Sequence, residues 1–340
     1  MTKKSRIFIP ILFLCVLIGL ILVAISIGVV AIPISDIISI ILSKIGVVKG
    51  LSYPEYIQLT ILELRLPRIL FSVFAGASLA ICGAVFQSVF RNPICDPYIL
   101  GISSGASLGA AIAFILGWDI LFLGVTLPAL ITALSTLLII IFIAKIGNKQ
   151  STYTLLLTGI AINFLISAVI TFLMVIYQQS LQKIIFWTMG SFSTIAWNDL
   201  FMLLPFLVVI VFFLFFYAKD LNVIQLGSEI AKSLGVHTER TTLIALSLAS
   251  LLTAIVVSLC GVIGFVGLIV PHIARILVGN HTRSVFLFSL FLGAIFMLIA
   301  DTLARTIAIP SELPVGSITA LIGAPYFIFL LLRKKNIYSL

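Results

Sequence analysis

Runs of apolar residues, each close to the length of a membrane span, follow one another along almost the whole chain and limit what it can fold into. A helix needs about 20 apolar residues to cross the hydrocarbon core of a bilayer. Of the 340 residues, 62% are hydrophobic and only 9% are charged, against roughly 25% charged residues in soluble proteins. A water-soluble fold is therefore excluded. The sequence predicts an all-α polytopic membrane protein, and because no polar linker divides it, we expect one domain over residues 1–340.

The apolar runs predict ten transmembrane helices joined by short loops. They are expected at 7–32, 58–87, 96–116, 120–144, 152–176, 198–218, 241–262, 265–279, 285–308 and 314–332. The first run is longer than the ~7–15 apolar residues of a signal peptide, and no Ala-x-Ala site follows it, so we interpret it as an uncleaved span. With the N-terminus inside, most Lys and Arg residues, such as Lys145 and Lys149, lie on the cytoplasmic side, and fewer, such as Lys44 and Lys49, lie outside. Both termini are then cytoplasmic.

The net charge of +9 does not indicate a nucleic-acid-binding protein, because the basic residues lie in short loops and at both ends rather than on one helix face. Of the four cysteines, three lie in apolar spans and Cys95 lies in an inner loop, so we expect no disulfide. None of His237, His272 and His281 stands at metal-ligand spacing from Cys, Asp or Glu. The sequence therefore predicts no metal site.

Two segments marked by glycine and proline interrupt the apolar sequence, Arg91–Gly101 and Gly261–Arg275. Irregular backbone at membrane depth is stable only where protein or a water-filled cavity surrounds it. The two segments therefore indicate a pathway through the membrane.

Three arginines are expected near the outer ends of spans. Arg65 and Arg68 flank a proline at the start of the second span, and Arg305 closes the ninth. Snorkelling toward the membrane interface accounts for any long cation at such positions. Bidentate recognition of carboxylates accounts for the choice of arginine. The residues alone leave both interpretations open.

The longest charged inner loop covers about residues 219–240. It contains Leu226-Gly-Ser-Glu-Ile-Ala-Lys-Ser-Leu-Gly235, a short stretch of helix pattern between glycines. A simple connector needs only a few residues. We interpret the stretch as a surface helix with Ala231 and Leu234 on one face, suited to docking in a groove of a partner.

The acidic residues disfavour an ion-coupled carrier, the alternative class of transporter. Such carriers keep ionisable residues near the midplane of the membrane, whereas here Asp301 is the acidic residue expected away from loops and span ends. No Gly-x4-Gly-Lys-Ser/Thr loop occurs, so the chain carries no phosphate loop of its own. No arrangement of nucleophile, base and oxyanion donors indicates an enzyme.

In its ordered motifs the sequence resembles the permease family of ABC transporters that import iron–siderophores, haem and cobalamin. The motifs include Leu64-Arg-Leu-Pro-Arg68, Arg91-Asn-Pro93, Trp187-Thr-Met-Gly-Ser191, Ser233-Leu-Gly235, Pro271-His-Ile-Ala-Arg275, Glu312-Leu-Pro-Val-Gly316 and Gly323-Ala-Pro-Tyr-Phe327. The resemblance covers nearly all of the chain beyond residue 60. It implies a vitamin B12 permease-like (type II importer) fold of about ten transmembrane helices in a bacterial cell membrane.

The resemblance also implies the partners. They are a second permease subunit, identical or paralogous, two cytoplasmic ABC ATPase subunits that hold ATP and Mg, and an extracytoplasmic substrate-binding protein or lipoprotein. The chain itself is then expected to bind no cofactor. Iron, if it is the cargo, crosses as a chelate, with a ferric siderophore expected first, haem next and cobalamin third.

Individual residues receive roles by the same resemblance. Arg65, Arg68 and Arg305 match positions that pair with glutamates of the binding protein. The segment Leu226 to Gly235 matches the part that seats on the ATPase, by the residues Leu226, Gly227, Ala231, Ser233, Leu234 and Gly235. The expected pathway and gate residues are Asn92, Ile94, Thr152, Tyr153 and Asn163. The chain departs from the common pattern at Ile94-Cys95-Asp96 and at Ser228, which concerns details of the gate and of the coupling loop.

Overall fold

The fold is given by a computed structural model that describes residues 3–28, 30–44, 46–47, 53–121, 123–146 and 152–335. Within these ranges every regular element is a helix. Lys49 and Lys149, which contributed to the predicted orientation, lie outside them.

Ten helical stretches correspond to the ten predicted spans. Six are long and apolar enough to cross a membrane: Glu55–Phe90 (α3, Glu55–Leu59; η1, Thr60–Arg65; α4, Leu66–Phe90), α6 (Thr126–Ile146), α7 (Thr152–Ile176), α9 (Trp197–Ile224), α11 (Thr238–Cys260) and α13 (Thr282–Thr306). The other four have shorter apolar stretches: α1 (Lys3–Ser26), α5 (Ile102–Ile115), α12 (Val266–Val278) and α14 (Val315–Lys335). The all-α membrane fold is confirmed, and the number of helices that cross the bilayer stays a prediction. The remaining short elements are α2 (Ile34–Lys44), η2 (Pro97–Leu100), η3 (Trp118–Ile120), η4 (Gln178–Ser180), α8 (Leu181–Thr188) and α10 (Ser228–Ser233).

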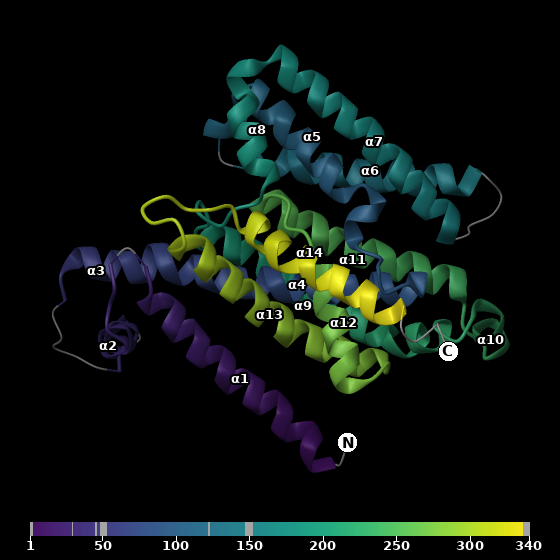
Figure 1. Cartoon of the computed structure of the whole chain (residues 1–340), viewed down its shortest axis with the longest axis horizontal. Helices are drawn as coiled ribbons and strands as arrows, with labels where there is room; N and C mark the ends of the chain where they lie inside the picture. The colour runs from purple at the N-terminus through teal and green to yellow at the C-terminus, as the bar shows by residue number, and fades with distance from the viewer. Residues whose placement is uncertain are drawn as a thin grey trace.

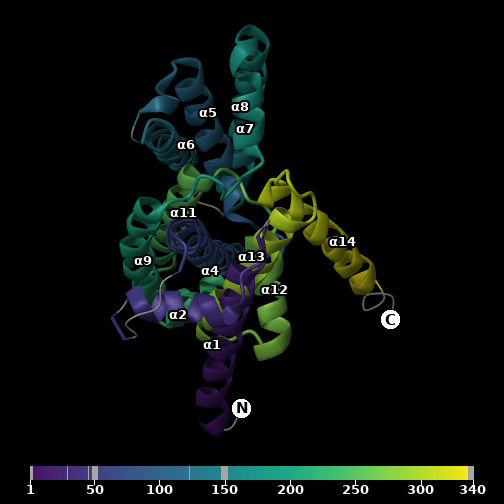
Figure 2. The same ribbon diagram turned by 90° about the vertical axis from the view of Figure 1, so that its left-hand side faces the viewer.

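Helix α4 lies at the centre of the molecule and packs against α9, α11, α12 and α13 (Figures 1 and 2). Nearly all of it is buried. Small residues allow this, because they let helix backbones approach closely. A Cβ added at Gly76 would collide with the carbonyl oxygen of Gly293, and one added at Gly83 with that of Gly267. The glycines of α4 therefore set its distance from α12 and α13.

Helices α5, α6, α7 and α8 lie together on one side of this central group (Figures 1 and 2). Gly105 and Gly109 bring α5 against Thr132, Thr136 and the carbonyl oxygen of Pro128 on α6. Much of the apolar surface of α6 and α7 is exposed in the isolated chain, as expected for helices that face lipid or another subunit.

The two ends of the molecule differ. Helix α1 begins and α14 ends on the side where α10 lies, at the right of Figure 1, and α2, α3 and α8 lie on the opposite side. The first and last helices therefore share the end that carries the 219–240 loop. By the positive-inside rule this is the end expected in the cytoplasm.

Candidate functional site

The two irregular segments found in the sequence meet in the structure. The hydroxyl of Tyr98, from the first segment, donates a hydrogen bond to the carbonyl oxygen of Ile263 in the second (2.8 Å) and accepts one from its N–H (3.3 Å). Asp96 caps η2 by accepting a hydrogen bond from the N–H of Tyr98 (2.9 Å). In the second segment Gly261 and Phe265 have left-handed φ angles of 77° and 69°. Protein groups thus form hydrogen bonds with backbone N–H and C=O groups that would have no partner in lipid.

A cavity of about 630 Å³ lies beside this junction. Both irregular segments contribute to its wall, through Tyr98 and Val262. Its other lining residues are Ile99, Ser103, Ser104, Ser107, Ile160, Asn163, Ser167, Ile170, Thr171, Met174 and Thr188. Hydroxyl and amide groups therefore supply the polarity of the wall, and none of its lining residues carries a formal charge.

Asn163 connects α7 to the first irregular segment. Its amide nitrogen donates hydrogen bonds to the carbonyl oxygens of Tyr98 (3.2 Å) and Ile99 (3.4 Å). Its amide oxygen accepts a hydrogen bond of 2.6 Å from the hydroxyl of Ser104. A predicted pathway residue therefore lies in the wall of the cavity and also fixes the position of α7 against the start of α5.

The other predicted gate residues lie at the end of the molecule near α10. Asn92 forms a local turn, in which its side-chain oxygen accepts a hydrogen bond of 3.0 Å from the N–H of Ile94. The side chains of Ile94 and Tyr153 are exposed (44% and 70%), and Thr152 is the first residue of α7. Asn92, Ile94 and Tyr153 do not line the 630 Å³ cavity. The structure thus separates them from Asn163, and their role in a gate stays a prediction.

The three outer arginines are buried in the structure. Arg65, Arg68 and Arg305 are only 8%, 9% and 7% exposed. Arg65 donates to the carbonyl oxygens of Ile25 and Val30, both at 2.6 Å, at the end of α1. Positive charge near a helix C-terminus is stabilising. This side chain therefore joins α1 to the π-helical turn η1.

Arg68 and Arg305 share the carboxylate of Asp301, which is fully buried. Arg68 donates to one oxygen of Asp301 from Nε (3.0 Å) and Nη2 (2.9 Å), and from Nη1 to Glu312 (2.8 Å). Nε of Arg305 lies 3.2 Å from the other oxygen of Asp301, and its Nη2 donates to the carbonyl oxygen of Ala24 (3.2 Å). We call Arg68, Asp301, Arg305 and Glu312 the outer charge cluster. It joins α1, α4 and α13.

The predicted coupling segment contains the expected short helix, α10, between Gly227 and Gly235, which have left-handed φ angles of 128° and 81°. The prediction that Ala231 and Leu234 share a face is wrong, because Ala231 is fully buried and Leu234 is 63% exposed. The exposed apolar residues are instead Leu226 (63%), Ile230 (49%) and Leu234. We call these three the apolar ridge. Ser233 does not belong to it, and its hydroxyl donates to the carbonyl oxygen of Ile230 (2.9 Å).

The sequence analysis missed three contacts. It did not pair Arg68 with Asp301, nor Ser104 with Asn163. It also missed that Arg275 reaches Gln87 and Ser88, which ties the end of α12 to α4. The spacing of Asp301 and Arg305, four residues apart on one helix, is a local signal that could have indicated the cluster.

A helical membrane protein whose broken backbone segments line an uncharged cavity has the construction expected of a permease. Comparisons with known proteins agree with this class. The FecCD transport family model matches residues 15–333. The chain therefore belongs to the FecCD transport family of membrane permeases, whose members are transport subunits rather than catalytic enzymes.

Individual relatives and a solved structure agree. The cobalamin import permease BtuC of Halobacterium salinarum is 43% identical over 287 residues, which cover 84% of this chain and 77% of that protein. The hemin transport permease HmuU of Yersinia pestis is 38% identical over 287 residues, covering 81% of this chain and 84% of that protein. A metal-chelate type ABC transporter solved in an inward-facing conformation superposes with a TM-score of 0.83 at 30% identity, over 96% of this chain and 99% of that one. The B12 permease-like fold is thereby confirmed.

Proposed function

We propose that the chain is one of two permease subunits of an ABC importer that carries a metal chelate into the cytoplasm of a bacterial cell. A ferric siderophore is our first candidate, followed by haem and cobalamin. The observation that carries the proposal is the uncharged, hydroxyl-lined cavity where the two irregular segments meet. Such a wall offers hydrogen bonds without selecting a formal charge, which suits a bulky ligand whose metal is already coordinated.

Replacing Asn163 tests the role of the cavity in transport. Asn163→Leu removes the hydrogen bonds to Tyr98, Ile99 and Ser104. We expect it to lower the rate of uptake, because α7 loses its polar connection to the irregular segment. Thr158→Val is the control, since Thr158 lies on the same helix but does not line the cavity. Unchanged uptake in Asn163→Leu would argue against this wall as the pathway.

The apolar ridge supports coupling to a separate ATPase subunit. Three large apolar side chains exposed on a polar loop are typical of a docking surface. Glycines with left-handed φ angles lie at both ends of the short helix, and Ala231 packs it against the protein. Ile230→Ser should uncouple ATP hydrolysis from uptake or release the ATPase. Glu229→Gln, at an exposed position of the same helix, should leave both unchanged.

Docking of an extracytoplasmic binding protein at the outer charge cluster is also part of the proposal. The carboxylate of Glu312 is 42% exposed and accepts a hydrogen bond from Nη1 of Arg68. A carboxylate of the binding protein can therefore reach this guanidinium by replacing Glu312. Glu312→Gln should raise the affinity for the binding protein, because it removes an internal competitor. A fall in affinity would show that Glu312 itself is part of the contact.

The deciding experiment is uptake into proteoliposomes that contain the permease, its ATPase and its binding protein. Ferric siderophores, haem and cobalamin are offered separately, with active or inactive ATPase. We expect uptake of one cargo only with the active ATPase. Uptake driven by an ion gradient without ATP would favour the alternative, an ion-coupled secondary transporter. Against that alternative, the buried Asp301 is held between two arginines rather than left free to exchange a proton.

A further inference from the structure

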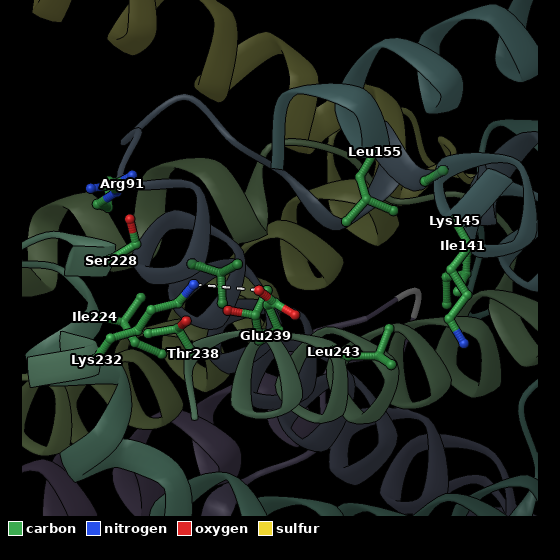
Figure 3. A pocket seen from close by; sticks show the side chains of 13 residues that line it. Arg91, Ile141, Lys145, Leu155, Ile224, Ser228, Lys232, Thr238, Glu239 and Leu243 are labelled. Carbon is green, nitrogen blue, oxygen red and sulfur yellow. Dashed lines mark hydrogen bonds and ion pairs between the residues drawn. The ribbon is translucent and has the colours of Figure 1, made fainter. Parts of the chain in front are cut away.

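A second cavity, of about 360 Å³, lies behind α10 (Figure 3). It is enclosed by the C-terminal ends of α4, α6 and α9, the first turns of α7 and α11, and α10 itself. Its volume is within the range of small-molecule sites, about 300–1,000 Å³. Its lining residues are Val89, Arg91, Ile141, Ala144, Lys145, Leu155, Ile224, Ser228, Lys232, Thr238, Glu239, Thr242 and Leu243.

Positive charge dominates the polar part of this lining. Arg91, Lys145 and Lys232 face one acidic residue, Glu239. Glu239 lies 3.4 Å from Lys232, and both side chains are more than half exposed, so the pair is weak. Neither Arg91 nor Lys145 forms an ion pair with any residue that the structure describes. Two cations of the pocket therefore have no acidic partner in this part of the chain.

The cations and the apolar side chains are arranged along the pocket. Figure 3 shows Arg91 and Lys232 toward one end and Lys145 toward the other, with Leu155 and Leu243 between them. The backbone fixes Arg91, which has a left-handed φ of 51° and donates its N–H to the carbonyl oxygen of Gln87. The pocket thus combines fixed positive charge with an apolar wall at the ends of membrane-spanning helices.

We propose that this pocket binds the phosphate group of an anionic phospholipid from the cytoplasmic leaflet. Basic pockets between helices on the cytoplasmic side are suited to such head groups, and the adjoining apolar wall accommodates the glycerol and the first acyl carbons. The phosphate takes the place of the missing acidic partner of Arg91, at the end of the pocket where Lys232 also lies. Through Lys232 it also contacts α10, so the lipid braces the segment that carries the apolar ridge.

The test measures binding to the purified full-length permease in detergent, without ATPase, binding protein or cargo. Phosphatidylglycerol is titrated against phosphatidylcholine, and binding is followed by native mass spectrometry. We expect tighter binding of phosphatidylglycerol. A cation near an anionic head group contributes about 1 kcal/mol, so Arg91→Gln and Lys232→Gln should each weaken binding about fivefold. Lys219→Gln, an exposed lysine on the same side of the molecule that does not line the pocket, should leave it unchanged.

Three results would overturn the proposal: no preference for phosphatidylglycerol, equal effects of the Arg91, Lys232 and Lys219 variants, or displacement of the lipid by glycerol 3-phosphate at equal concentration. The last result would identify a soluble phosphate as the ligand. Circular dichroism of each variant excludes misfolding as the cause of weaker binding. Because no transport is measured, failure of the proposed importer function would leave this result standing, and the reverse also holds.

Discussion

Replacing Asp301 with asparagine keeps the volume of the side chain and removes the charge that joins Arg68 to Arg305. Asp301 lies 2.9–3.2 Å from both guanidinium groups and is fully buried. Breaking a buried ion pair by removing one partner costs about 3–5 kcal/mol, because the other charge stays buried. Arg68 still forms its ion pair with Glu312, so the loss of stability comes mainly from Arg305, whose buried charge loses its ion pair with Asp301. We therefore expect Asp301→Asn to lower the free energy of unfolding by about 3 kcal/mol, the low end of that range.

Equilibrium unfolding by SDS in mixed micelles, followed by circular dichroism, measures this loss. Glu312→Gln is the matched control, because the carboxylate of Glu312 is 42% exposed and such a pair contributes about 0.2–1 kcal/mol. Combining Asp301→Asn with Arg305→Met should recover part of the stability, since it removes the unpaired buried cation. A loss below about 0.5 kcal/mol for Asp301→Asn, or an equal loss for Glu312→Gln, would refute the view that buried charge holds α4 and α13 together.

Two further predictions concern close packing and burial. Gly83→Ala should lower stability by more than about 2 kcal/mol in the same assay, because its Cβ meets the backbone of Gly267, whereas Gly264→Ala has open space and should be neutral. In variants otherwise free of cysteine, maleimide should label native Cys95 at least about 100-fold more slowly than Ile94→Cys at pH 7.5, because Cys95 is 2% exposed and burial raises the pKa of its thiol to about 11. The rate at Cys95 should rise with pH as thiolate forms; equal rates at both positions would contradict the burial.

The sequence predicted the helices well because a membrane span is a local property. Length and apolar composition mark a span without knowledge of its neighbours, and each of the ten predicted ranges contains a helix in the structure. The two irregular segments were also visible, since Gly and Pro mark them. The hydrogen bond between Tyr98 and Ile263 could not be predicted, because the residues are 165 positions apart and only the packing of η2 and α5 against α11 brings them together.

The errors have a physical cause as well. The burial of the arginines was not predicted, because the sequence did not show that Asp301 and the carbonyl oxygens at the end of α1 would satisfy their charge. Ala231 was placed beside Leu234 by assuming that both face a partner. In the structure the small side chain of Ala231 is the one that fits against the protein, so the large apolar residues of the segment face outward.

The contacts of α4 and α7 indicate which part of the chain can move. Near one end α4 is tied to α13 through Arg68, and near the other it is tied to α12, where the amide of Gln87 donates to the carbonyl oxygens of Gly267 (3.3 Å) and Leu268 (2.9 Å). Helix α7 instead meets the irregular segment through the hydrogen bonds of Asn163 and the close approach of Gly159 to the carbonyl oxygen of Ile99, and it exposes most of its surface. Packed elements with many close contacts move as units, whereas a few hydrogen bonds at the boundary can exchange. We therefore expect that α7 and its neighbours move relative to the group around α4 when the cavity opens to the other side of the membrane.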